Sequence, residues 1–213
     1  MKITGAIFDF DGTLFDSMHL WKNIRQEFFD RLGIVLTDED KNDFKGLMLR
    51  ESLILAKDKF ELKHSDEELF NSFFQLIEEK YLADSKPKND IVEFLEKLKS
   101  KNVKMCIATA TGESALKTVL KKFNLLDYFT SIYSTYTVGA AKTEPTVYRV
   151  AHNSIGTDKN TTWVFEDALY AAKTAKADGF NLVGIYDESE KNTDKLKEIA
   201  DIYIHNYNEL NIE

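Results

Sequence analysis

The stretch ITGAIFDFDGTL, residues 3–14, decides the expected fold. Its first part, Ile3–Phe8, is short and apolar, as in a strand that is buried on both faces of a sheet. Two carboxylates, Asp9 and Asp11, follow directly and lead into a glycine-containing turn. In open α/β sheets, ligands bind beyond the carboxyl ends of the strands. The stretch therefore predicts a buried parallel strand that delivers two acids to an active site.

The spacing of these two acids is compatible with a catalytic role but does not require one. Asp9 and Asp11 are two residues apart, so in extended backbone their side chains point to the same side. Carboxylates that close raise one another's pKa unless a proton or a cation lies between them. A metal-neutralised carboxylate can act as nucleophile, and a protonated carboxyl can act as general acid and then base. A polar turn after a strand explains the spacing equally well.

The next part of the chain has a helical pattern. From about Ser17 to Leu82, apolar residues recur at helical spacing, and no strand-like run interrupts them. Ser65 and Glu68 have the spacing of a capping box at the start of the last of these helices. We therefore expect a helical cap domain, residues 17–83, inserted after the first strand.

The rest of the chain alternates between strand-like and helical runs, which indicates right-handed crossovers and a parallel sheet. We expect an α/β core domain of residues 1–16 and 84–213. In order, the expected elements are helix Asp90–Ser100, strand Val103–Ala108, helix Glu113–Phe123, a weaker strand near Phe129–Tyr133, helix Thr146–His152, strand Thr161–Phe165, helix Ala168–Ala177, strand Leu182–Tyr186, helix Asp194–Ile199 and strand Ile202–Ile204.

Composition excludes several classes of protein. The net charge of -8 would repel nucleic acid and anionic membranes over most of the surface. No apolar run approaches eighteen residues, and the first residues do not have the pattern of a secretory signal. The single cysteine, Cys106, allows no intramolecular disulfide and no thiolate metal site. We expect a cytoplasmic protein that binds neither nucleic acid nor membrane and is a monomer or a weak dimer.

Three further motifs lie at the carboxyl ends of expected strands or in a loop before a helix. Thr109 and Thr111 end an apolar run, where a hydroxyl and exposed amides can hold a phosphoryl oxygen, although Thr111 as a helix N-cap is the simpler interpretation. Lys142 could balance carboxylates and phosphate, or be a solvated surface lysine. Glu166 and Asp167 suit Mg²⁺, although Asp167 could equally cap the following helix.

One parallel sheet would bring all four motifs together, and their joint occurrence is far less likely to be accidental than any one alone. The set Asp9-x-Asp11-Gly12-Thr13, Thr109, Lys142 and Glu166-Asp167 resembles the haloacid dehalogenase (HAD) superfamily, in particular its phosphatase and β-phosphoglucomutase-like members. The resemblance covers nearly the whole chain. It implies a Rossmann-like parallel sheet flanked by helices, with an inserted α-helical cap domain.

The resemblance also implies roles for the four core residues. Asp9 would attack phosphorus and form a phospho-aspartate, while Asp11 would protonate the leaving oxygen and later activate water or a sugar hydroxyl. Thr109 and Lys142 would bind the phosphoryl oxygens, and Lys142 would orient Asp9. Gly12 and Ala110 are expected beside the substrate.

A magnesium ion is the cofactor that the resemblance implies. Its expected ligands are the side chain of Asp9, the main-chain carbonyl of Asp11 and the side chain of Asp167, with Glu166 as a further acid of the cluster. The sequence departs from the common family pattern after Lys142, where Thr143 stands in place of a proline. It departs again after the acidic pair, where Ala168 and Ala171 replace the usual serine and glycine.

The expected function is a Mg²⁺-dependent phosphatase of a small phosphorylated metabolite, such as a sugar phosphate. Two alternatives stay open from the motifs: a β-phosphoglucomutase-like phosphomutase, and a non-catalytic module that binds a phosphorylated ligand. Substrate choice in the family comes mostly from the cap, where His19, Lys45 and Arg50 are the candidates. For each of the three, a solvated helix face or a capping role is the simpler interpretation.

Overall fold

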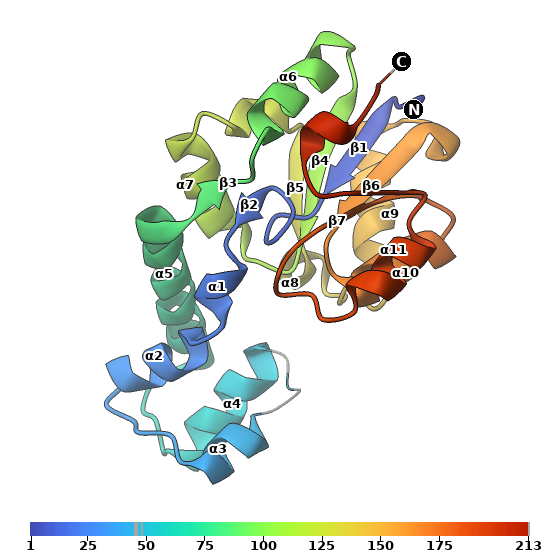
Figure 1. Ribbon diagram of the computed structural model, residues 1–213. Helices are drawn as coiled ribbons and strands as arrows, with labels where there is room; N and C mark the ends of the chain where they lie inside the picture. Colours follow the sequence, from blue (N-terminus) through green and yellow to red (C-terminus); the bar gives the residue numbers. More distant parts are fainter. Residues whose placement is uncertain (45–46, 48, 213) are drawn as a thin grey trace.

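The computed structural model describes residues 1–44, 47 and 49–212. Its centre is a six-stranded sheet in which every neighbouring pair of strands is parallel (Figure 1). The strands are β1 (Gly5–Phe8), β4 (Lys104–Thr109), β5 (Ser131–Ser134), β6 (Thr162–Glu166), β7 (Asn181–Ile185) and β8 (Ile202–Ile204). Their order across the sheet is β5-β4-β1-β6-β7-β8. The parallel α/β sheet expected from the sequence is confirmed.

The strand order reverses at β1. From β1 the chain winds outward through β4 and β5, then returns to the other side of β1 and winds outward through β6, β7 and β8. The loops that leave the carboxyl ends of β1, β4 and β6 therefore diverge at one place, which is where ligands bind in sheets of this kind. Asp9, Ala110 and Asp167 directly follow these three strands.

Helices cover both faces of the sheet because successive strand residues point in opposite directions. Ile7 packs in one core cluster with residues of α9 (Thr146–Ile155), α10 (Leu169–Ala177) and α11 (Thr193–Ile199). Phe8 packs in the other with residues of α6 (Ile91–Ser100) and α7 (Glu113–Lys122). The rings of Phe8 and Phe165 stack with centroids 4.4 Å apart. This contact joins β1 and β6 directly before Asp9 and Glu166.

In the described part of the chain, five helices lie between two short strands that cross from the core and back (Figure 1). They are α1 (Met18–Trp21), α2 (Ile24–Arg31), α3 (Asp38–Asp43), α4 (Leu49–Lys59) and α5 (Asp66–Asp84), and we call them the helical insertion. The crossing strands, β2 (Phe15–Asp16) and β3 (Lys86–Pro87), pair antiparallel. The long helix α5 packs against α7 of the core. Ser65 and Glu68 form the expected capping box at its start.

The expected core elements are present, with ends that differ by up to three residues. The sequence interpretation missed the crossing strands β2 and β3, the short helix α8 (Thr135–Val138) and three 3₁₀ turns, Leu126–Tyr128, Lys159–Thr161 and Tyr207–Glu209. Strands of two residues and single turns have too few residues for periodicity to reveal them. Among the described residues, no helix has both the length and the apolar composition needed to cross a membrane.

Candidate active site

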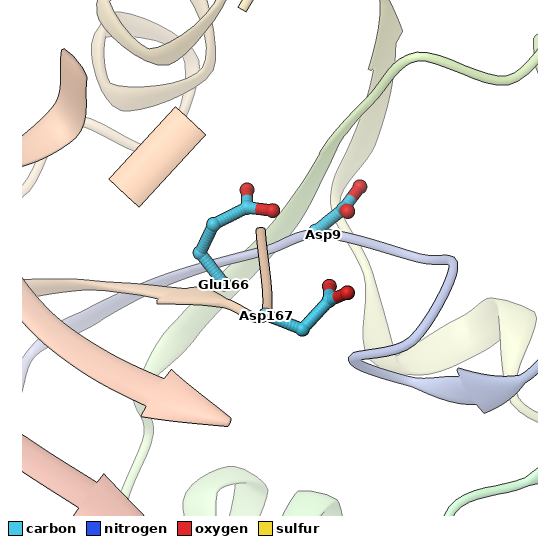
Figure 2. A group of neighbouring side chains, drawn as sticks. All are labelled: Asp9, Glu166 and Asp167. Atoms are coloured by element: carbon cyan, nitrogen blue, oxygen red, sulfur yellow. The ribbon is translucent and has the colours of Figure 1, made fainter. Parts of the chain in front are cut away.

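Three buried carboxyl groups meet at the carboxyl ends of two neighbouring strands (Figure 2). Asp9 follows β1, and Glu166 and Asp167 lie at the end of β6, which pairs directly with β1. One carboxylate oxygen from each of the three lies within 4.8 Å of the other two. The sequence prediction that these acids gather at one edge of the sheet therefore agrees with the structure.

Lys142 lies among these acids rather than at the surface. It comes from the loop between α8 and α9 and is 2% exposed. Its Nζ lies 2.6 Å from Asp9 Oδ1 and 2.9 Å from Glu166 Oε2. Tyr148 of α9 donates its hydroxyl proton to the same Glu166 oxygen at 2.9 Å. Glu166 thus holds Lys142 in place, and Lys142 in turn contacts Asp9.

The charges of this cluster do not balance. Burial, followed by the charge of Glu166, raises the pKa of Asp9 to about 7, although Lys142 opposes the shift. Burial, Glu166 and Asp9 raise the pKa of Asp167 well above its ordinary value. Burial lowers the pKa of Lys142, but the charges of Asp9 and Glu166 outweigh it, so this pKa lies above its usual range. Three ionised carboxylates against one ammonium would leave a net charge of −2.

A divalent cation fits this donor set. Carboxylate oxygens are the ligands that Mg²⁺ prefers, and a charge of two would offset the surplus negative charge. Thr13 donates its hydroxyl proton to Asp167 Oδ1 at 2.8 Å, which fixes the orientation of that carboxylate. Metal sites are commonly supported by hydrogen bonds of this kind to their ligands.

Gly12 allows the chain to turn tightly against Asp167. Its φ is +74°, in the left-handed region that glycine adopts without steric cost. A Cβ atom at this position would lie 2.3 Å from Asp167 Oδ2 and 2.6 Å from its carboxyl carbon. A side chain at residue 12 would therefore displace the acid. Direct contact of Gly12 with a substrate stays a prediction.

Asp11 accepts three short hydrogen bonds from hydroxyl groups of different segments. Ser17, before α1, and Tyr81, in the last turns of α5, each donate to Oδ1 at 2.6 Å. Thr111, in the loop after β4, donates to Oδ2 at 2.6 Å. Burial raises the pKa of Asp11, and the three hydroxyl groups oppose that rise. A carboxyl group with a raised pKa that is still able to ionise suits general acid and base catalysis.

The position of Thr111 corrects one interpretation of the sequence. The N-cap of α7 is Gly112, and Thr111 uses its hydroxyl to bind Asp11 instead of capping the helix. Thr109 is fully buried at the end of β4, where its Oγ1 accepts a hydrogen bond from the Thr111 amide at 3.0 Å. Contact between Thr109 and a phosphoryl group stays a prediction.

Asp167 corrects a second interpretation. The N-cap of α10 is Ala168, so Asp167 does not cap this helix as the alternative interpretation held. Its side chain belongs to the acidic cluster. The replacement of a usual family serine by Ala168 leaves the N-cap without a side-chain hydrogen bond. The Leu169 amide is instead bound by the Glu190 carboxylate, 2.9 Å away.

A cavity of about 780 Å³ lies over these residues, between the core and the helical insertion. Asp9, Asp11, Ala110 and Asp167 line it from the core. Residues that line it from the insertion include Trp21, Lys22, Arg25, Lys41 and Phe73. A cavity of this size accepts a small organic molecule.

Two of the three candidate substrate residues of the insertion, His19 and Arg50, do not line this cavity. His19 contacts Asp84 at 3.2 Å and lines a second cavity beside the crossing strands. The Arg50 guanidinium lies 5.3 Å from the centre of the Phe70 ring and is not part of the catalytic cavity wall. Lys45 lies outside the described residues. Substrate contact by these three stays a prediction.

Three polar residues of the site were not assigned a role from the sequence: Ser17, Tyr81 and Tyr148. Ser17 lies in the Asp-Gly-Thr-Leu-x-Asp-Ser pattern of residues 11–17, which could have indicated it. Tyr81 is 70 residues from Asp11 in the sequence, and no local pattern predicts their contact. Tyr148 belongs to the apolar stripe of α9 with Val147, Ala151 and Ile155, so it looks like an ordinary core residue.

A family model described as haloacid dehalogenase-like hydrolase matches residues 6–185. The chain belongs to this family. The match runs from β1 to the end of β7 and includes Asp9, Asp11, Lys142 and Asp167. The resemblance inferred from the motifs is therefore confirmed, and the molecule is a hydrolase of the haloacid dehalogenase type.

Three known proteins illustrate the relationship. A phosphorylated carbohydrates phosphatase from Thermotoga maritima is 27% identical over 181 residues, which cover 84% of this chain and 82% of that protein. The crystal structure of CbbY from Rhodobacter sphaeroides in complex with phosphate has a TM-score of 0.80 at 18% identity, covering 99% of this chain and 97% of that one. A β-phosphoglucomutase from Clostridium difficile has a TM-score of 0.70 at 22% identity, covering 98% and 93%. The two structures share the fold.

Proposed function

We propose that this protein is a Mg²⁺-dependent phosphatase of a small phosphorylated metabolite, of the sugar phosphate class, that forms a phospho-aspartate on Asp9. The observation that carries the proposal is the contact of Asp9 with Lys142 at 2.6 Å, beside Asp167 and on the wall of a cavity. It is supported by family membership and by the similarity to a phosphorylated carbohydrates phosphatase. In this proposal, residues 17–83 form the cap domain over the site.

Asp9 and Asp11 carry out the chemical steps of the proposed reaction. An ionised oxygen of Asp9 attacks phosphorus, the ester P–O bond breaks, and Asp11 gives its proton to the leaving oxygen. Water then attacks the phosphorus of the phospho-aspartate, Asp11 takes a proton from that water, and the P–O bond to Asp9 breaks. Inorganic phosphate leaves, and both aspartates return to their starting state.

Lys142 and its neighbours control the charge of the nucleophile. Burial raises the pKa of Asp9 to about 7, so positive charge beside this carboxyl group promotes its ionised, attacking form. Lys142 supplies one such charge and would also bind a phosphoryl oxygen. Glu166 fixes the ammonium position by binding it, and the Tyr148 hydroxyl donates to the same oxygen of Glu166.

The residues that would hold Mg²⁺ are Asp9 and Asp167 by their side chains and Asp11 by its main-chain carbonyl, with Glu166 beside them. The bound ion would offset the negative charge of the nucleophile and of the phosphate. Glu166 Oε2 already accepts hydrogen bonds from Lys142 and Tyr148. We therefore assign Glu166 mainly to the positioning of Lys142.

Hydrolysis of para-nitrophenyl phosphate tests the proposal. Wild-type protein with Mg²⁺ should release nitrophenol, the chelator EDTA should stop the reaction, and Asp9→Asn should reduce it by at least about 1,000-fold, because the substituted amide cannot act as the nucleophile. Asp178→Asn is a matched control, since Asp178 is paired with Arg149 and Lys159 away from the site. Activity of D9N equal to wild type would contradict the proposed nucleophile.

A second assay separates the alternatives. Release of inorganic phosphate from sugar phosphates supports the phosphatase, and interconversion of hexose phosphates with a bisphosphate primer supports a phosphomutase. Binding of sugar phosphates by wild-type protein without turnover of any phosphate ester would favour a non-catalytic module.

A further inference from the structure

The helical insertion places an arginine without a carboxylate partner in the wall of the catalytic cavity. Arg25 lies in the first turn of α2 and is about half buried. Its Nη1 donates to the main-chain carbonyl of Phe44 at 2.7 Å. None of its other N–H groups has a hydrogen-bond acceptor, and no carboxylate lies within 4.0 Å of it, among the residues that the structure describes.

Two of the other three arginines of this chain are paired with carboxylates, and the third, Arg50, is exposed and lies 5.3 Å from the centre of the Phe70 ring. Arg31, on the same helix, lies 2.7 Å from a carboxylate oxygen of Glu79, and Arg149 lies 2.5 Å from Asp178. Both are more exposed than Arg25, so an ion partner benefits them less. Burial alone lowers the pKa of Arg25, with no neighbouring carboxylate to oppose it. Burial of an unpaired cation is unfavourable. An arginine in such a position indicates a site for an anion from outside the chain.

Lys22 adds a second positive charge to the same wall. It follows α1 directly, lies three residues before Arg25, and lines the same cavity. It is exposed and has no carboxylate within 4.0 Å among the described residues. Lys41, from α3, also lines the cavity, but its Nζ forms an ion pair with Asp38 Oδ1 at 3.4 Å. The insertion side of the cavity is therefore positively charged, although the protein as a whole carries a net charge of -8.

These cations are additional to those needed for the reaction itself. Lys142 contacts Asp9 from the core, where the phosphoryl group reacts in the proposed function. Arg25 and Lys22 belong to the insertion, on the other side of a cavity of about 780 Å³. A space of that size holds more than one phosphate group.

We propose that the substrate carries, besides the phosphoryl group that is removed, a second anionic group that binds Arg25, with Lys22 beside it. This inference rests on the proposed phosphatase function. The second group is a carboxylate or another phosphate, because the guanidinium binds both through two parallel N–H groups. Its substrates are then phosphorylated sugar acids or sugar bisphosphates, and simple neutral sugar monophosphates bind less well.

A matched pair of substrates tests the proposal. 6-Phosphogluconate and glucitol 6-phosphate differ only at carbon 1, which is a carboxylate in the first and a neutral alcohol in the second. Fructose 1,6-bisphosphate and fructose 6-phosphate make the corresponding comparison for a second phosphate. In at least one pair, wild-type kcat/KM should be about 10- to 100-fold higher for the more anionic member, the range expected for a charge-assisted hydrogen bond.

Substitutions of Arg25 distinguish a role in binding the second anionic group from a role in stabilising the fold. Arg25→Met should abolish the preference, mainly through KM, by lowering kcat/KM for the more anionic member of a pair far more than for its less anionic partner or for para-nitrophenyl phosphate. Arg25→Lys should retain part of the preference. Arg31→Met removes the same charge from the same helix outside the cavity and should keep the wild-type preference. Thermal melting of each variant monitors the fold.

Several results would overturn the inference. The first is a wild-type protein whose kcat/KM is the same for the two members of each substrate pair. The second is an R25M protein whose kcat/KM falls by the same factor for para-nitrophenyl phosphate and for both members of a pair, as a purely structural role of Arg25 would produce. If wild-type protein hydrolyses none of these esters, the proposed function fails. Calorimetric binding of 6-phosphogluconate and glucitol 6-phosphate to wild-type and R25M protein then decides the anion site by itself, and equal affinities would refute it.

Discussion

Removal of the Tyr81 hydroxyl should change the acidity of Asp11. Tyr81 is fully buried, and its hydroxyl donates to Asp11 Oδ1 at 2.6 Å, together with Ser17. A hydrogen bond to a charged group contributes about 1.5–3 kcal/mol, and one pKa unit corresponds to about 1.4 kcal/mol. Because this bond favours the ionised carboxylate, Tyr81→Phe should raise the pKa of Asp11 by about 1–2 units.

The pH dependence of kcat reports this change. With para-nitrophenyl phosphate the leaving group needs little protonation, so attack of water on the phospho-aspartate should limit kcat and should require ionised Asp11. The acid limb of the profile should therefore move to higher pH by about 1–2 units in Y81F. Ser17→Ala should move it in the same direction.

Tyr128→Phe is the matched control, because the Tyr128 hydroxyl donates to Glu96 at the surface, away from the site. Its profile should equal that of the wild type. An acid limb that stays in place in a folded Y81F protein would refute the argument that the insertion tunes Asp11 through this hydroxyl.

Three further predictions concern the loop, the cluster and the thiol. Gly12→Ala should lower Mg²⁺ affinity measured by calorimetry, because the new Cβ would displace Asp167, whereas Gly33→Ala, also at a φ of +74° but with open space around it, should lose only about 1–2 kcal/mol of stability in urea titrations. Equal Mg²⁺ affinity in the two variants would contradict this. In EDTA, the ionisation of Asp9 should cost on the order of 4 kcal/mol of folding stability as pH rises from about 4 to about 7, because the folded-state pKa of Asp9 is raised from 3.8 to about 7. Mg²⁺ should reverse this dependence of stability on pH in melting experiments. A thermal stability in EDTA that does not change between about pH 4 and about pH 7 would contradict the prediction. Cys106 is fully buried, which raises its thiol pKa, so a thiol reagent should label it only after denaturation, and rapid labelling of native protein would disprove that placement.

The sheet and the acidic cluster with Lys142 could be predicted from the sequence because both depend on local patterns. Alternating strands and helices imply parallel strands, and parallel strands place their carboxyl ends at one edge. Asp9, Lys142 and Asp167 could therefore be expected together although they are far apart in the chain. The structure places Lys142 within 2.6 Å of Asp9.

Contacts between the insertion and the core could not be predicted in the same way. The bond from Tyr81 to Asp11 depends on how α5 packs against α7, and no periodicity encodes that arrangement. Arg25 looks in sequence like any other charged helix residue, and only the cavity reveals that it lacks a partner. His19 was chosen for its residue type, yet the direction of α1 turns it towards Asp84.

The long helix α5 joins the core at the antiparallel pair of crossing strands, so a rotation about that pair would move its two ends by different distances. Its 19 residues span about 28 Å at 1.5 Å per residue. A rotation of about 10° at β3 would carry the far end near Asp66 by about 5 Å, but Tyr81, only about 6 Å from the crossing strands, by about 1 Å. A rotation of this kind would widen the space between the insertion and the core, while the Tyr81 hydroxyl would stay within reach of Asp11.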